Sequence, residues 1–132
     1  GMVDSLITGG GRLIGVYAKE PELLQQFTKR YPKVKIAKNE NEIIEDNSIQ
    51  LVASAAIPIE RAPIGIRVMK SGKDFMTDKP GILTLEQFAE VKKIQKETKR
   101  IYSIVYSERL ANPASVKAGE LVSAGAIGWC KL

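Results

Sequence analysis

The sequence predicts an α/β protein with a doubly wound parallel sheet. Short apolar segments alternate with amphipathic segments of helical length, and residues 48–56 (SIQLVASAA) are apolar almost without interruption. Strands that alternate with helices of about 10 to 15 residues form βαβ units with right-handed crossovers. A nearly continuous apolar strand is typical of a parallel sheet covered on both faces. Together, the alternation and this strand favour an α/β fold.

The first half of the chain is expected to hold three strands with a helix between each pair. The strands are residues 12–18, 34–37 and 48–56, and the helices are residues 21–32 and 39–47. A proline begins the first helix, where its missing N–H would be unpaired in any case. An asparagine at position 39 or 41 would cap the second helix by accepting a backbone hydrogen bond.

The second half continues the alternation. Helices are expected at residues 59–72, 85–98 and 113–124, strands at residues 74–77 and 100–106, and an edge strand near residues 129–132. Pro63 is tolerable only in the first turn of its helix, because it lacks an N–H, and Gly72 would end that helix. Thr84 and Gln87 have the spacing of a capping box.

Composition excludes several classes of protein. At 132 residues and 44% hydrophobic content the chain predicts one domain with a buried core. The net charge of +5 comes from dispersed lysines and arginines without interleaved aromatic residues, which argues against nucleic-acid binding. No apolar stretch is long enough to span a membrane. A lone cysteine and no histidine argue against disulfides and metal sites and favour a reducing cytoplasm.

One polar segment between a strand and a helix is a candidate for chemistry. TDKPG, residues 77–81, follows a short apolar strand and precedes the helix with the capping box. In open α/β sheets, ligands bind at the carboxyl ends of the strands. Lys79 is therefore either a functional cation at this edge or an exposed loop lysine.

Three segments in the correct order resemble one family of enzymes. The quoted segments are MKSGKDFMTDKPGILTLEQFAEVKKIQ (69–95), RLIGVYAKEPELLQQFTKRYP (12–32), and SERLANPA with GELVSAGAIGWC near the end. They resemble the glucose–fructose oxidoreductase and inositol dehydrogenase family (Gfo/Idh/MocA). The resemblance implies a Rossmann-type domain that binds NAD or NADP. It also implies hydride transfer to or from a sugar, polyol or similar hydroxyl or carbonyl substrate.

The resemblance assigns roles to the TDKPG segment. Lys79 would be the catalytic lysine, near the nicotinamide and the reacting hydroxyl, where a cation can polarise a carbonyl or share in proton transfer. Pro80 would fix its backbone, with a preceding peptide bond that is often cis in this family. Asp78 stands where the family usually has glutamate. These three residues are expected to contact the cofactor.

The family's opening strand and its G-x-G-x-x-G turn are missing from this sequence. Gly9–Gly11 follow a helical segment, residues 2–7, and precede a strand, so they predict a helix-to-strand turn rather than a phosphate loop. In strand order 3-2-1-4-5-6 the missing strand is central, and its loss would leave two half-sheets. We therefore expect residues 1–132 to be a partial NAD(P)-binding domain, inactive alone, that belongs to a longer polypeptide or receives a strand from elsewhere. The chain would end at the crossover into an absent substrate domain. In the family that domain usually forms the oligomer interface, so a homo-oligomer is compatible with the sequence.

The choice between NAD and NADP depends on the residue at the end of the second strand of the family's nucleotide-binding domain. Many relatives carry an aspartate there, which binds the adenosine ribose, whereas this chain has Ala18 and then Lys19. A cation without the carboxylate favours the 2′-phosphate of NADP, although Glu20 could still bind a ribose and retain NAD.

Further cofactor contacts are implied after the apolar strand. Relatives often read A-T-P-x-x-x-H there, and this chain has four small or apolar residues and then Arg61 near the usual histidine. The four are Ala55, Ala56, Ile57 and Pro58. Arg109 matches an arginine that lies near the cofactor in the family. A surface ion pair with Glu108 or Glu120 is an equally favoured role for it. Because of these departures, a degenerate Rossmann protein that binds a nucleotide or partner without catalysis is the alternative function.

Overall fold

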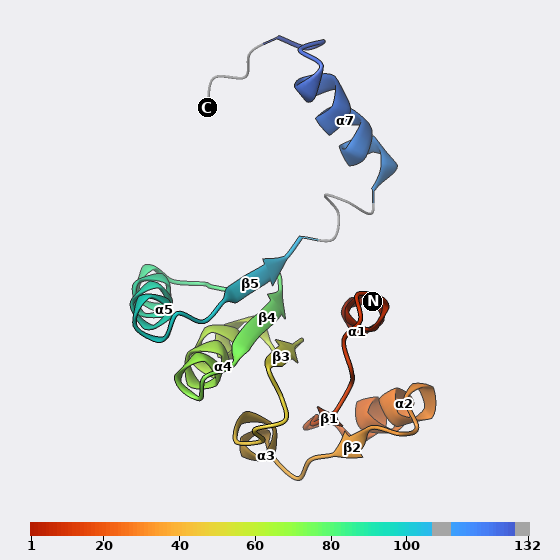
Figure 1. Cartoon of the computed structure of the whole chain (residues 1–132), viewed down its shortest axis with the longest axis vertical. Coiled ribbons are helices and arrows are strands. Elements are labelled where there is room, and N and C mark those ends of the chain that lie inside the picture. The colour runs from red at the N-terminus through yellow and green to blue at the C-terminus, as the bar shows by residue number, and fades with distance from the viewer. Residues whose placement is uncertain (107–111, 129–132) are drawn as a thin grey trace.

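The computed structural model describes residues 1–106 and 112–128 (Figure 1). They form two parallel β-sheets and the helices that precede, connect and follow the strands. Among the described residues, none of the helices combines the length and apolar character needed to cross a bilayer. The expected edge strand at residues 129–132 and Arg109 lie outside the described residues.

The first sheet contains the two N-terminal strands. Its elements in chain order are α1 (Met2–Thr8), β1 (Gly15–Val16), α2 (Pro21–Arg30), β2 (Lys35–Ile36) and α3 (Glu40–Ile44). β1 and β2 are parallel, with Gly15 opposite Lys35. Both strands are shorter than predicted. Asn39 is the cap of α3, since its side chain accepts a hydrogen bond from the Glu42 amide at 3.0 Å.

The glycine segment after α1 is a turn, as predicted. The Gly11 amide donates to the Leu6 carbonyl at 2.9 Å, which ends the helix before the chain enters β1. Gly10 has φ of +93°, a conformation that residues with a Cβ rarely adopt. The order helix, turn, strand is the reverse of the order in a phosphate-binding loop.

The second sheet contains three strands. Its elements are β3 (Leu51–Ser54), α4 (Pro58–Lys70), β4 (Asp74–Asp78), α5 (Leu85–Thr98) and β5 (Tyr102–Val105), followed by α7 (Pro113–Ser123). The strand order is β3-β4-β5 and all pairs are parallel. The Thr84 hydroxyl accepts from the Gln87 backbone amide at 3.1 Å, so Thr84 caps α5 as predicted. The Gln87 side chain accepts from the Leu83 amide at 2.9 Å, so the reciprocal half of the predicted capping box is shifted by one residue.

Pro63 departs from its prediction. It lies inside α4, beyond the first turn, because the helix begins at Pro58. A proline there leaves the carbonyl four residues earlier without its helical donor. In this structure the Gln87 side-chain amide donates to that carbonyl, of Ile59, at 3.4 Å. A contact from α5 therefore replaces part of the hydrogen bond that the proline removes.

The core lies between α4 and the second sheet. Phe75 and Met69 have no exposed surface, and α5 adds Val91 and Ile94. Gly65 allows the close approach of α4, because a Cβ there would lie 2.6 Å from the Phe75 ring. Leu51 and Ala53 on β3 are exposed, so the prediction that this strand is covered on both faces is wrong: α4 and α5 pack on one face of its sheet (Figure 1).

The two sheets are not hydrogen bonded to each other. β1 pairs with β2, β3 pairs with β4, and neither pairs with the other across the division (Figure 1). The predicted division of the sheet is confirmed. The strand expected between β1 and β3 has no counterpart among the described residues, so each of these strands has an edge without a β-sheet neighbour.

Candidate functional site

Two of the predicted site segments lie at one edge of the second sheet. β3 ends at Ser54 and β4 at Asp78, and the parallel register pairs Ser54 with Thr77. The loop of residues 55–57 and the loop of residues 79–81 therefore leave the sheet side by side. Their position at the carboxyl ends of adjacent strands is where ligands bind in α/β sheets.

Arg61 connects these two loops. Its side chain is buried, with 7% of its surface exposed. Nε donates to the Ala56 carbonyl at 2.7 Å, and one terminal nitrogen donates to the carbonyls of Asp78 at 3.0 Å and Pro80 at 2.9 Å. A guanidinium suits this task, because its fixed fork of donors can hold several acceptors at once. Sequence reasoning treated Arg61 only as the residue that replaces a histidine, and it missed this role.

The loop after β4 is held at a second point. The Lys79–Pro80 peptide bond is cis, in agreement with the sequence expectation. The Tyr102 hydroxyl donates to the Gly81 carbonyl at 2.7 Å, and burial raises the pKa of Tyr102 to about 12. A Cβ at Gly81 would lie 2.5 Å from Ile104, so only glycine fits there without displacement. The backbone on both sides of Pro80 is thereby fixed.

Lys79 itself is exposed at the rim of this edge. Its amide donates to the Asp78 carboxylate at 2.8 Å, so Asp78 turns toward the backbone of the loop. Ile57 in the neighbouring loop is 60% exposed and offers an apolar surface beside the loop after β4. The edge thus combines a cation, an apolar surface and small residues, which permit the close approach of a flat ligand.

Lys19 and Ala18 follow β1, on the other side of the division between the sheets. The Lys19 ammonium donates to both carboxylate oxygens of Glu60, at 2.9 and 3.0 Å. Glu60 lies in the first turn of α4, so this ion pair spans the two sheets. The hydrogen bond to Glu60 is the main cause of the raised pKa of Lys19.

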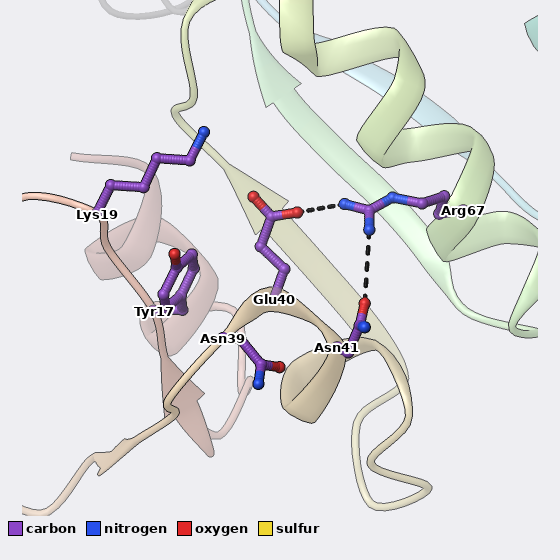
Figure 2. Close-up of a pocket in the computed structure, with 6 residues that line it drawn as sticks. All are labelled: Tyr17, Lys19, Asn39, Glu40, Asn41 and Arg67. Carbon is purple, nitrogen blue, oxygen red and sulfur yellow. Dashed lines mark hydrogen bonds and ion pairs between the residues drawn. The ribbon is translucent and has the colours of Figure 1, made fainter.

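A hollow of about 360 Å³ lies beside Lys19 (Figure 2). The lining residues come from three regions of the chain and each carries a polar or charged group: Tyr17, Lys19, Asn39, Glu40, Asn41 and Arg67. Arg67 reaches from α4 to form an ion pair with Glu40, as the dashed line in Figure 2 shows. The Lys19 side chain extends along the same hollow, on the opposite side of Glu40 from Arg67 (Figure 2).

The structure thus groups the predicted site residues into two sets. Arg61 joins Ala55–Ile57 to Asp78–Pro80, and Pro58 begins the helix that carries Arg61. Ala18 and Lys19 form the second set, connected to the first through Glu60. Among residues 1–106 and 112–128, no three histidine, cysteine, aspartate or glutamate side chains gather in a way that could hold a metal ion.

Solved structures share this fold. A protein from Erwinia carotovora atroseptica SCRI1043 named as an oxidoreductase is 38% identical, with a TM-score of 0.89, and the match covers 94% of this chain and 37% of that one. This chain therefore spans little more than a third of the length of that protein.

Two more distant structures contain a dinucleotide. Biliverdin reductase from Synechocystis, in complex with biliverdin and NADP⁺, has a TM-score of 0.69 at 19% identity, covering 75% of this chain and 31% of its own. Levoglucosan dehydrogenase, in complex with NADH and levoglucosan, has a TM-score of 0.74 at 24% identity, covering 87% and 31%. At these identities the two matches show the fold.

The family assignment comes from a sequence profile. No match was found among curated proteins. The profile described as an oxidoreductase family with an NAD-binding Rossmann fold, GFO_IDH_MocA, matches residues 5–106. This range includes both sets of site residues. The chain belongs to this Gfo/Idh/MocA family of oxidoreductases.

Proposed function

We propose that this chain is the nucleotide-binding part of an NAD(P)-dependent oxidoreductase that acts on a sugar, polyol or related hydroxyl or carbonyl substrate. The observation that carries the proposal is the Asp78–Pro80 loop, which Arg61 fixes at the carboxyl edge of the sheet. A ligand at this edge would meet the Lys79 cation at the rim. The NAD-binding description of the family, and the NADP⁺ and NADH bound in two structures of similar fold, support a nicotinamide cofactor.

The residues at the two ends of the site suit the two ends of a dinucleotide. At the first set, Lys19 and the side chains of the polar hollow provide charges and hydrogen-bonding groups for an adenosine ribose. At the second, the small side chains Ala55 and Ala56 leave room for close contact, and Ile57 offers an apolar surface to a nicotinamide ring. Arg109 remains a proposed contact outside the described residues. These residues therefore fit the adenosine end and the nicotinamide end of a dinucleotide.

In the proposed mechanism, Lys79 acts on the substrate oxygen. A bound dinucleotide would supply or accept the hydride. In the direction of reduction, the Lys79 ammonium donates a hydrogen bond to the carbonyl oxygen and stabilises the negative charge that develops there. Its Nζ then gives a proton to that oxygen, and in the oxidation direction a neutral Nζ takes the proton from the hydroxyl. Arg61 acts earlier, by holding the backbone from which Lys79 projects.

Lysine footprinting tests the site in the chain as it stands. Acetylation of the exposed lysines is followed by mass spectrometry with and without NADH or NADPH. Bound dinucleotide should protect Lys79 and Lys19, while Lys92 and Lys93 on α5 should react equally in both samples, because they lie on an exposed helix face remote from the strand ends. Equal modification of Lys79 and the α5 lysines would contradict the proposed site.

Turnover tests the catalytic role. In an active oxidoreductase that contains this chain, Lys79→Ala should lower kcat by about a hundredfold, the typical contribution of one acid–base group. The dissociation constant of the dinucleotide should change much less, because most of its contacts lie elsewhere. Protection of Lys79 together with unchanged turnover in the variant would favour the non-catalytic nucleotide-binding alternative.

A further inference from the structure

Lys19 is not available as a lone cation. Sequence reasoning favoured NADP because a lysine without a neighbouring carboxylate would attract a 2′-phosphate. In the structure a carboxylate is present, supplied by Glu60 from a position 41 residues away along the chain. Glu60 contacts the Lys19 ammonium with both of its oxygens, at 2.9 and 3.0 Å.

A second carboxylate faces the same hollow. Glu40 begins α3 and forms an ion pair with Arg67 (Figure 2). Its negative charge also acts on Lys19 and contributes to the raised pKa of that lysine. Two cations, Lys19 and Arg67, are therefore balanced by two carboxylates, Glu60 and Glu40. These four charges sum to zero.

We propose that Glu60 selects the dinucleotide by neutralising Lys19, so that the site prefers the ribose hydroxyls of NAD to the 2′-phosphate of NADP. This inference rests on the proposed function and concerns which form of the cofactor the same site accepts. A 2′-phosphate carries about −1.5 to −2 charges at neutral pH, like other phosphate monoesters. Near Lys19 it would compete with Glu60 for the ammonium and be repelled by that carboxylate.

The ribose of NAD interacts differently with the same groups. Its hydroxyls are hydrogen-bond donors, and a carboxylate accepts such bonds strongly, which is why an acidic residue commonly binds this ribose in Rossmann domains. The usual acidic position after the second family strand holds Ala18 here. Glu60 brings a carboxylate to Lys19, the residue next to Ala18, from another element of the fold.

The experiment uses adenosine fragments of the two cofactors. 2′,5′-ADP and 5′-AMP differ by the 2′-phosphate, and neither contains the pyrophosphate that a glycine-rich turn would bind. Their dissociation constants are measured by NMR titration on the 132-residue chain, its Glu60→Gln variant and a matched control, Glu90→Gln. Glu90 is an exposed residue of α5, so the control makes the same change in net charge away from the site.

Glu60→Gln should tighten the binding of 2′,5′-ADP relative to 5′-AMP by about tenfold, the effect expected of one charge a few ångströms away in a partly screened site. The control should leave this ratio unchanged. Adding Lys19→Met to Glu60→Gln should abolish the gain, because the released cation is its source. The gain should also shrink as salt rises, since exposed charges are screened.

The outcomes separate the two proposals. If the chain binds both fragments and Glu60→Gln leaves their ratio unchanged, the role of Glu60 is overturned and the proposed function stands. If the gain persists in the double variant, neutralisation of Lys19 is overturned as the cause. If neither fragment binds the unsubstituted chain, the adenosine site and the proposed function fail together.

Discussion

Replacing Arg61 with methionine tests whether this side chain holds the two loops of the candidate site. Methionine keeps much of the apolar stem but removes all three hydrogen bonds, to the carbonyls of Ala56, Asp78 and Pro80. Each lost bond from a buried charged donor should cost about 1 kcal/mol net, after the relief of the buried charge is taken into account. The free energy of unfolding should therefore fall by about 3 kcal/mol.

The matched control is Arg67→Met, on the same helix. Arg67 is 47% exposed and forms a surface ion pair with Glu40, so its loss should cost about 0 to 1 kcal/mol. Urea unfolding followed by circular dichroism measures both variants. With a slope of about 2 kcal/mol per molar urea, the Arg61 variant should unfold at a midpoint lower by about 1.5 M.

A third variant separates charge from geometry. Arg61→Lys retains the cation but offers one nitrogen in place of the guanidinium fork, so its stability should lie between those of the wild type and Arg61→Met. The reasoning is refuted if Arg61→Met and Arg67→Met lower the midpoint equally. Full recovery in Arg61→Lys would show that the charge matters and the three-point geometry does not.

Gly65→Ala should lower the free energy of unfolding by about 1 to 3 kcal/mol, because its Cβ would meet the rings of Phe75 and Tyr102. By contrast, Gly119→Ala in the exposed helix α7 should raise the helix content measured by circular dichroism. Tyr102→Phe should cost about 1 kcal/mol through the lost bond to the Gly81 carbonyl. The pKa of Tyr102 is raised to about 12 in the folded state, so its stabilising effect is lost as the pH rises from about 10 to 12. The urea midpoint of Tyr102→Phe should therefore fall less over that pH range than the midpoint of the wild type. A hydrogen bond from Tyr31 lowers the pKa of Asp4 to about 2. The free energy of unfolding of the wild type should therefore decrease as the pH falls from about 4 to 2, and that of Asp4→Asn should decrease less. Equal decreases in the two proteins would contradict this.

Local sequence signals predicted the order of elements well. The cap Thr84 and the stop at Gly72 act on backbone groups within a few residues, so their positions can be read along the chain. The cap of α3 was narrowed to Asn39 or Asn41, and the structure shows Asn39. The division of the sheet was also predicted, because the family resemblance supplies a strand order into which the expected strands can be placed. These features depend on neighbours in sequence or on a known topology.

Other features could not be predicted, because the packing of distant elements decides them. The side chains of Leu51 and Ala53 have the character of covered residues, and only the placement of the helices shows that their face of β3 is open. Pro63 is accommodated inside α4 by a donor from α5. Neither outcome leaves a local trace in the sequence.

The sequence by itself determined that this is an α/β chain of the Rossmann type with Lys79 and Pro80 at a strand end. Only the tertiary structure decided what surrounds the site: Arg61 between two loops, and Glu60 on Lys19. Arg61 contacts Asp78 and Pro80, 17 and 19 positions away, and Lys19 contacts Glu60, 41 positions away and across the division of the sheets. A charged residue satisfies its hydrogen bonds with whatever the fold brings near, and its type and spacing do not specify that partner.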